Sequence, residues 1–177
     1  MPELPEAETL RRGLAARITG LRITALEVLD RKISGGPGDA IKRDVVDHQI
    51  SRVARRGKVL ILFLHEPGSG AGEPGSLLIH PKMTGQLVLT SDGATMFAGG
   101  HPTPSMLRPM PNATTRAVFR LGPACCLYHN DARRLARRTC SAGRACPATC
   151  AARRSSAPQS RAARPTSART ASNAKAE

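Results

Sequence analysis

Pro2 and Glu3, at the start of the chain, carry groups that together suit attack on an electrophilic carbon. The sequence begins MPELPE, so removal of Met1 would leave the secondary amine of Pro2 as the amino terminus. An α-amino group has a pKa of about 8, so it is partly unprotonated near neutral pH. Such an amine can form an iminium with a sugar C1′, as lysine does in Schiff bases. Pro2 is therefore a candidate nucleophile, and Glu3 beside it is a candidate general acid or base.

Glu6 has two interpretations. It either orients the pair of Pro2 and Glu3, or it is an acidic residue in the first turn of a helix. The second role is equally well supported, because the positive end of the helix dipole favours a carboxylate there.

The reactive groups need a rigid element behind them, and residues 3–19 are predicted to form a helix. Pro5 suits the first turn, where its missing N–H costs nothing. Leu10, Leu14 and Ile18 recur every four residues and form an apolar stripe, and Gly20 is a plausible stop. The stripe predicts that one face of this helix is buried.

The chain beyond the helix is predicted to be mainly β. Alternating or continuous apolar runs predict strands at 22–30, 50–54, 59–64, 77–80, 86–90, 114–121 and 126–128, with a short helix at 39–47. Residues 91–112 are rich in Gly, Pro and Met and predict a long loop. We therefore expect an α+β, mainly β fold: an antiparallel β-sandwich of about eight strands with an amino-terminal helix and a short second helix.

Composition points to a polyanionic partner. The net charge is +14 and the pI about 11.1, which favours nucleic acid. With three Phe, one Tyr and no Trp, base stacking on aromatic side chains is poorly supported. No Cys-x-x-Cys pair, signal peptide or apolar run of about 18 residues is found, so we expect a cytoplasmic protein without a metal site.

Four segments resemble the formamidopyrimidine-DNA glycosylases and their endonuclease VIII-like relatives. They are MPELPE with ETLRRGL, then RRGK, LIHPKMTGQL and YHNDARR, at residues 1–14, 55–58, 78–87 and 128–134. The resemblance covers about 1–134, the family's catalytic amino-terminal domain. It implies a bacterial, nucleoid-associated monomer that excises oxidised purines from duplex DNA and cleaves abasic sites.

The resemblance also implies roles for individual residues in the chemistry. Pro2 corresponds to the Schiff-base nucleophile and Glu3 to a proton donor. Lys58 corresponds to the lysine that donates a proton during β-elimination. Without the family context, Lys58 would be interpreted as a solvated turn lysine or a phosphate contact.

Further residues are implied to contact DNA. Met83 corresponds to a wedge that fills the gap left by a flipped nucleotide. Arg133, followed by Arg134, corresponds to the arginine that probes the orphaned base. A histidine that contacts DNA in the family aligns with Thr114 here, and His101 is the substitute candidate. We interpret His80 as structural.

The sequence departs from the family after Arg134. Leu135 stands where the family has Phe, and residues 136–177 contain eight Arg, 13 Ala and no Val, Ile, Leu, Met, Phe, Tyr or Trp. We expect 135–177 to be disordered. The segment is either a basic nucleic-acid-binding tail or a GC-rich coding region read out of frame. The break within a motif favours the second interpretation.

The family's second domain, with its helix–two-turn–helix element and four-cysteine zinc finger, has no counterpart here. Cys140, Cys146 and Cys150 have the wrong spacing for that finger, so no zinc or other cofactor is expected. Three functions stay open: a weakened glycosylase and abasic-site lyase, a non-enzymatic basic DNA-binding protein, and an inactive remnant.

Overall fold

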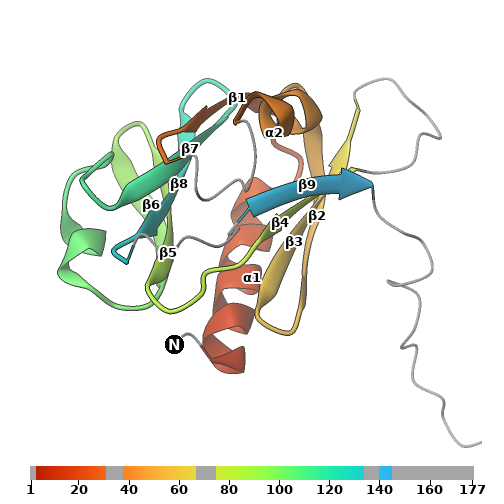
Figure 1. Ribbon diagram of the computed structural model, residues 1–177. Helices are drawn as coiled ribbons and strands as arrows, with labels where there is room; N and C mark the ends of the chain where they lie inside the picture. The colour runs from red at the N-terminus through yellow and green to blue at the C-terminus, as the bar shows by residue number, and fades with distance from the viewer. Residues whose placement is uncertain (1–2, 31–37, 67–74, 134–139, 145–177) are drawn as a thin grey trace, which may run out of the picture. The chain divides into compact units, whose positions relative to one another are not determined.

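Two antiparallel sheets and two α-helices make up the part of the chain that the computed structural model describes, residues 3–30, 38–66, 75–133 and 140–144. The five-stranded sheet has the order β1-β7-β8-β5-β6 and the four-stranded sheet the order β2-β3-β4-β9 (Figure 1). The elements are α1 (Leu4–Ile18), β1 (Ile23–Val28), α2 (Gly38–Val45), β2 (Gln49–Arg56), β3 (Val59–His65), β4 (Gly75–Ile79), β5 (Gly85–Ser91), β6 (Ala94–Gly100), the 3-10 helix η2 (Pro104–Leu107), β7 (Thr115–Leu121), β8 (Cys125–Asp131) and β9 (Cys140–Arg144).

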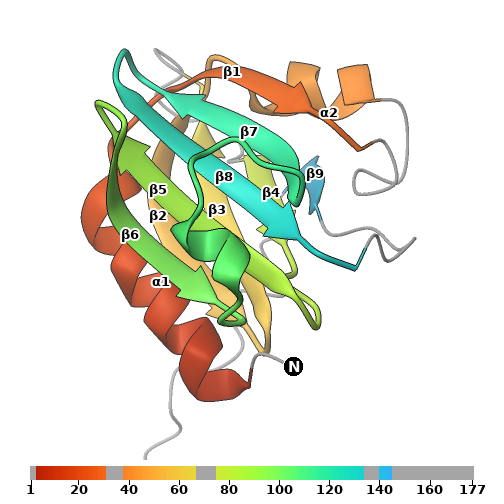
Figure 2. The ribbon, with the colours of Figure 1, turned by 90° about the vertical axis from the view of Figure 1, so that its left-hand side faces the viewer.

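The predicted antiparallel β-sandwich with an amino-terminal helix and a short second helix is confirmed. Figure 2 looks onto the five-stranded sheet, with β2, β3 and β4 behind it. The inner faces of both sheets supply one core, to which Leu62, Leu87 and Phe119 contribute fully buried side chains. Among the described helices, none is long and apolar enough to span a membrane.

Helix α1 forms where the leucine stripe predicts it. Leu10, Leu14 and Ile18 are fully buried. At the start of the helix, the Glu6 carboxylate accepts a hydrogen bond from the Glu3 N–H at 2.5 Å, which satisfies a backbone donor that the helix leaves free. At its end, Gly20 has a φ of 88° and donates its N–H to the carbonyl of Ile50 in β2 at 2.7 Å, and the chain then turns into β1, the edge strand of the five-stranded sheet.

The helix packs against strands of both sheets, β2 on one side and β6 on the other. Its contact with β6 depends on Gly13, because a Cβ there would lie 2.2 Å from the Phe97 ring. Arg17 stacks over the same ring at 5.5 Å, and Leu10 packs onto Gly99 of the strand. Helix α1 is thereby fixed relative to both sheets, which fixes the position of its first turn.

Two segments differ from the prediction. Ala94–Gly100, within the predicted loop 91–112, forms β6. Its small and glycine residues weaken the strand pattern, yet they let the strand approach α1 closely. Cys140–Arg144, within the segment expected to be disordered, forms β9 antiparallel to β4, with Leu77 opposite Ala142. Main-chain pairing needs no apolar side chains, so composition did not reveal it.

Candidate active site and nucleic-acid interface

Most of the site residues predicted from the sequence lie in turns at one end of the sandwich. The start of α1, the β2–β3 turn, the β4–β5 turn and the end of β8 all lie in the lower part of both ribbon views (Figures 1 and 2). Pro2 and Arg134 lie outside the described residues. The first described residue of the predicted site is therefore Glu3.

Glu3 is exposed and precedes the first turn of α1. Its backbone N–H is held by the Glu6 carboxylate. Glu6 thus acts on the backbone next to Pro2, and it does so as a helix-capping residue. This hydrogen bond gives Glu6 a role at the start of the helix, and its role in orienting Pro2 stays a prediction.

Lys58 lies in the tight turn between β2 and β3, where Arg56 pairs with Val59. Gly57 has a φ of 59°, a left-handed conformation that glycine adopts without strain. Its carbonyl accepts a hydrogen bond from Nη1 of Arg55 at 3.1 Å. The turn that presents Lys58 is therefore short and held by a neighbouring guanidinium.

The β4–β5 turn is shaped to present Met83. Nδ1 of His80 accepts the N–H of Lys82 at 2.8 Å, and Lys82 has a φ of 54°. Gly85 closes the turn, because a Cβ there would lie 1.9 Å from the Pro81 carbonyl oxygen. Met83 is left 38% exposed and is one of the exposed large apolar side chains among the described residues.

Electrostatics place Lys58 near the β4–β5 turn. Partial burial lowers the pKa of His80, and the positive charges of Lys82 and then Lys58 lower it further. Lys58 lies in the β2–β3 hairpin of the four-stranded sheet, and Lys82 lies in the turn that connects β4 of that sheet to β5 of the other. Two lysine charges therefore act on the β4–β5 turn, which also carries Met83.

Arg133 lies beside Met83. Its Nη1 is 3.8 Å from Sδ of Met83, and its side chain is exposed. Its backbone N–H donates to Oδ1 of Asp131 at 3.0 Å. The same carboxylate oxygen accepts the hydroxyl of Thr84, the residue after Met83. Asp131 is only 2% exposed, so one buried carboxylate holds the backbone of Arg133 and the neighbour of Met83 together.

Thr114 and His101 lie near this cluster through backbone contacts. The Thr114 carbonyl accepts the N–H of Asp131 at 2.8 Å, and its hydroxyl donates to Asn112. His101 donates its N–H to the Gly85 carbonyl at 3.2 Å. Both candidates are therefore near the β4–β5 turn and the end of β8.

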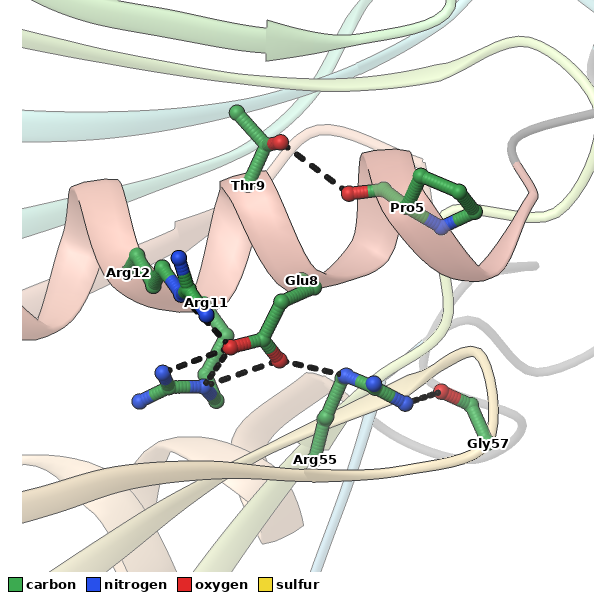
Figure 3. A network of polar contacts seen from close by, with 7 residues as sticks. All are labelled: Pro5, Glu8, Thr9, Arg11, Arg12, Arg55 and Gly57. Atoms are coloured by element: carbon green, nitrogen blue, oxygen red, sulfur yellow. Dashed lines mark hydrogen bonds and ion pairs between the residues drawn. The ribbon is translucent and has the colours of Figure 1, made fainter.

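A second polar network, missed by sequence reasoning, joins α1 to β2. Glu8 accepts hydrogen bonds from Arg11, Arg12 and Arg55 at 2.7, 2.9 and 2.7 Å (Figure 3). These bonds, led by that of Arg11, hold the pKa of the Glu8 carboxyl well below its usual range. Only the pairs within the helix have a recognisable spacing; nothing in the sequence links Glu8 to Arg55, 47 positions away.

An open groove of about 600 Å³ runs along this network between α1 and β2. Its lining includes Glu8, Arg11, Arg52 and Arg55, and it contains none of the described site residues predicted from the sequence. The described residues also hold no cluster of three His, Cys, Asp or Glu side chains that suits a metal ion.

Comparisons with known proteins agree on one family. A profile of the formamidopyrimidine-DNA glycosylase N-terminal domain matches residues 1–138. The chain is 37% identical over 138 residues to the formamidopyrimidine-DNA glycosylase of Pelotomaculum thermopropionicum, which covers 77% of this chain and 42% of the relative. It is 37% identical over 134 residues to that of Heliobacterium modesticaldum, covering 75% of this chain and 42% of the relative. The chain thus spans less than half the length of these relatives.

Solved structures show the same fold. One is the complex of Lactococcus lactis Fpg with DNA containing an abasic site, with a TM-score of 0.61 and 23% identity. Another is wild-type Lactococcus lactis Fpg with DNA containing N7-benzyl-Fapy-dG, with a TM-score of 0.61 and 24% identity. Each match covers 81% of this chain and 44% of the other.

Proposed function

Because the chain belongs to the formamidopyrimidine-DNA glycosylase family, we propose that it acts on damaged duplex DNA as a glycosylase and abasic-site lyase. The observation that carries the proposal is the contact of Met83 with Arg133 at the end of the sandwich where α1 begins. An apolar side chain and a cation held side by side suit the gap and the orphaned base left by a flipped nucleotide.

The proposed reaction starts with the amine of Pro2 after removal of Met1. Its attack forms the N–C1′ bond and breaks the bond from C1′ to the base, which leaves with the bonding electrons and takes up the proton that the amine loses. Glu3 donates a proton as the sugar ring opens to the iminium. Solvent water then takes the C2′ proton, the C3′–O bond breaks with its electrons on the departing phosphate oxygen, and Lys58 donates a proton to that oxygen in this β-elimination. The proposal assigns no cofactor to these steps.

The substrate class is the finer part of the proposal. We assign oxidised purines, following the family resemblance, and action on duplex DNA would place the protein at the bacterial chromosome. Single-turnover base release from duplexes with one oxidised purine or one oxidised pyrimidine tests the preference. Faster release of the pyrimidine would overturn it.

Borohydride trapping tests the proposed chemistry in the full chain. Incubation with a labelled abasic-site duplex should give a covalent complex in wild type and none in Pro2→Gly. Pro5→Ala is the matched control, because Pro5, in the first turn of α1, is a proline only three positions away in the sequence but has no free amine. Intact mass establishes whether Met1 has been removed. A folded wild type with Met1 removed that traps nothing, or equal trapping by Pro2→Gly, would refute the proposal.

The charge of residues 136–177 favours a second candidate function, non-enzymatic DNA binding. Eight Arg, one Lys and one Glu give this segment a net charge of +8. In that case the affinity for undamaged duplex should be strongly salt-dependent and unchanged in Pro2→Gly. Deletion of 146–177, which keeps β9, should then remove most of the affinity. A small loss would contradict it.

A further inference from the structure

We propose that Glu8 and Arg55 are positioning residues: together they hold the turn that carries Lys58 against the helix that carries Glu3. Neither residue touches the reacting atoms in this proposal. It rests on the proposed function, because the lyase roles of Glu3 and Lys58 belong to that proposal. What the pair adds is a fixed spacing between two catalytic elements that are far apart in the sequence.

Two hydrogen bonds in series connect α1 to the β2–β3 turn. Oε2 of Glu8 accepts Nε of Arg55 at 2.7 Å, and Nη1 of Arg55 donates to the Gly57 carbonyl at 3.1 Å (Figure 3). Gly57 directly precedes Lys58. Glu8 lies five residues after Glu3, about 7.5 Å along the helix axis. The bridge therefore joins α1 close to its reactive end.

Arginine suits this position for a geometric reason. Its guanidinium donates in two fixed directions, here to a carboxylate and to a carbonyl, whereas a lysine ammonium is a point charge on a flexible stem. The partner carboxylate is fixed in turn by Arg11 and Arg12 of its own helix. With side chains 27% and 26% exposed, Arg55 and Glu8 are partly shielded from water. Such a pair is less screened than an ion pair on an open surface.

The turn needs an external support. It consists of Gly57 and Lys58, and Gly57 is exposed in a left-handed conformation, with open space where a Cβ would lie. Glycine leaves such a turn many accessible conformations. The hydrogen bond from Arg55 restricts the peptide that leads into Lys58, and Glu8 restricts Arg55.

The alternative, a ligand site in the groove between α1 and β2, is less well supported. The guanidiniums of Arg11 and Arg55 that line this groove are bonded to Glu8, which lines it too. Arg52 stacks over the Phe63 ring at 4.2 Å. The three arginines that line the groove thus already have partners within the protein, and the main ion pair in the groove is that of Glu8 with Arg55.

A test in the full chain compares Glu8→Gln and Arg55→Lys with Arg12→Ala. Arg12 binds the same carboxylate from the helix but does not reach the turn, so its loss is the matched control. Because Lys58 acts after the iminium forms, we expect strand nicking to fall about tenfold relative to borohydride-trapped complex in the first two variants. Arg12→Ala should keep the wild-type ratio. An unchanged ratio in Glu8→Gln and Arg55→Lys would overturn the proposal.

Hydrogen exchange supplies a readout that does not depend on activity. The amides of residues 56–59 should exchange at least tenfold faster in Glu8→Gln and Arg55→Lys, with those of β5 unchanged. Arg12→Ala should match wild type. Exchange at wild-type rates in Glu8→Gln would refute the positioning role. If wild type traps no DNA, the proposed function fails, and the exchange rates still decide whether the pair holds the turn.

Discussion

The Arg133 guanidinium lies 3.8 Å from the Met83 sulfur, although 50 positions separate the two residues. Both are presented to solvent, one from the β4–β5 turn and the other from the end of β8. The contact itself is weak, since a thioether is a poor acceptor. The two side chains are instead held together by the buried Asp131, because one oxygen of its carboxylate accepts hydrogen bonds from the Thr84 hydroxyl and the Arg133 N–H.

Asp131→Ala should therefore destabilise the fold and separate the two DNA-contact candidates. Loss of a buried acceptor leaves the Thr84 hydroxyl and the Arg133 N–H without their partner, at a cost of about 1–3 kcal/mol. Urea unfolding measures this change. Asp92→Asn, at an exposed acid in the β5–β6 turn, is the control and should change the free energy of unfolding much less, because asparagine tolerates the φ of 50° at this position. Equal effects of the two substitutions would argue against Asp131 as a structural centre.

Met83→Ala should weaken binding to abasic-site DNA without loss of fold. The side chain is partly exposed, so the free energy of unfolding should change by about 0.5 kcal/mol or less. If Met83 fills the gap in the duplex, affinity for an abasic-site analogue should fall about tenfold, with little change for undamaged duplex. Fluorescence anisotropy measures both. Met96→Ala, at an exposed methionine of β6, is the control; an equal loss there would contradict a wedge role for Met83.

Gly13→Ala should loosen the contact of α1 with the five-stranded sheet. The added Cβ would meet the Phe97 ring at 2.2 Å, and overpacking of this kind costs about 1–3 kcal/mol. In the double variant with Phe97→Ala the clash is absent, so the two changes should be less than additive. Thermal or urea unfolding of the three variants completes the cycle. Strict additivity would show that the helix and the ring do not press on each other.

His129 should make stability depend on pH below neutrality. The residue is fully buried, and within the described part of the chain neither ring nitrogen has a hydrogen-bond partner. Burial lowers its pKa to about 4, with Lys82 and Arg116 adding to the effect and Asp131 opposing it. In the unfolded chain His129 has a pKa of about 6.5, so as the pH falls it takes up a proton there before it does so in the folded protein. The contribution of His129 to the free energy of unfolding is therefore fully present above pH 6.5 and is lost as the pH falls towards 4. The loss approaches about 3 kcal/mol.

Urea unfolding between pH 7 and 4.5 measures this dependence, and His129→Phe should flatten it. His80→Gln is the control: the pKa of His80 is also lowered, but its side chain is only partly buried, so most of the slope should stay. A slope that is unchanged in His129→Phe would assign the effect to other groups.

Local patterns predicted much of the fold. The four-residue spacing of Leu10, Leu14 and Ile18 located α1, because residues at this spacing lie on one face of a helix and that face is buried. The glycines of β6 and the low-complexity sequence of β9 gave no such signal, since α1 and the backbone of β4 stabilise these strands from outside. The family resemblance, based on four short segments, is confirmed over residues 1–138.

The site was predictable only as separate segments. The motif containing Asp131 and Arg133 was recognised, but its link to Thr84 depends on the pairing of β5 with β8. The ion pair of Glu8 and Arg55 depends on how α1 lies across β2. Contacts between distant elements follow from tertiary packing, which residue spacing does not encode. The roles assigned to the site residues all stay predictions, and two of these residues, Pro2 and Arg134, also lie outside the described part of the chain.

The pairing of β9 with β4 has a consequence for the solution behaviour of shortened chains. Without residues 140–144, the backbone of β4 would become an open edge carrying Leu77 and Ile79, both fully buried in the sandwich. Exposed apolar edges recruit strands from other molecules and lead to aggregation. A chain cut before residue 140 should therefore self-associate in a concentration-dependent manner, while one cut after residue 144 should not. Residues 140–144, although low in sequence complexity, would then protect the edge of β4 from pairing with other molecules.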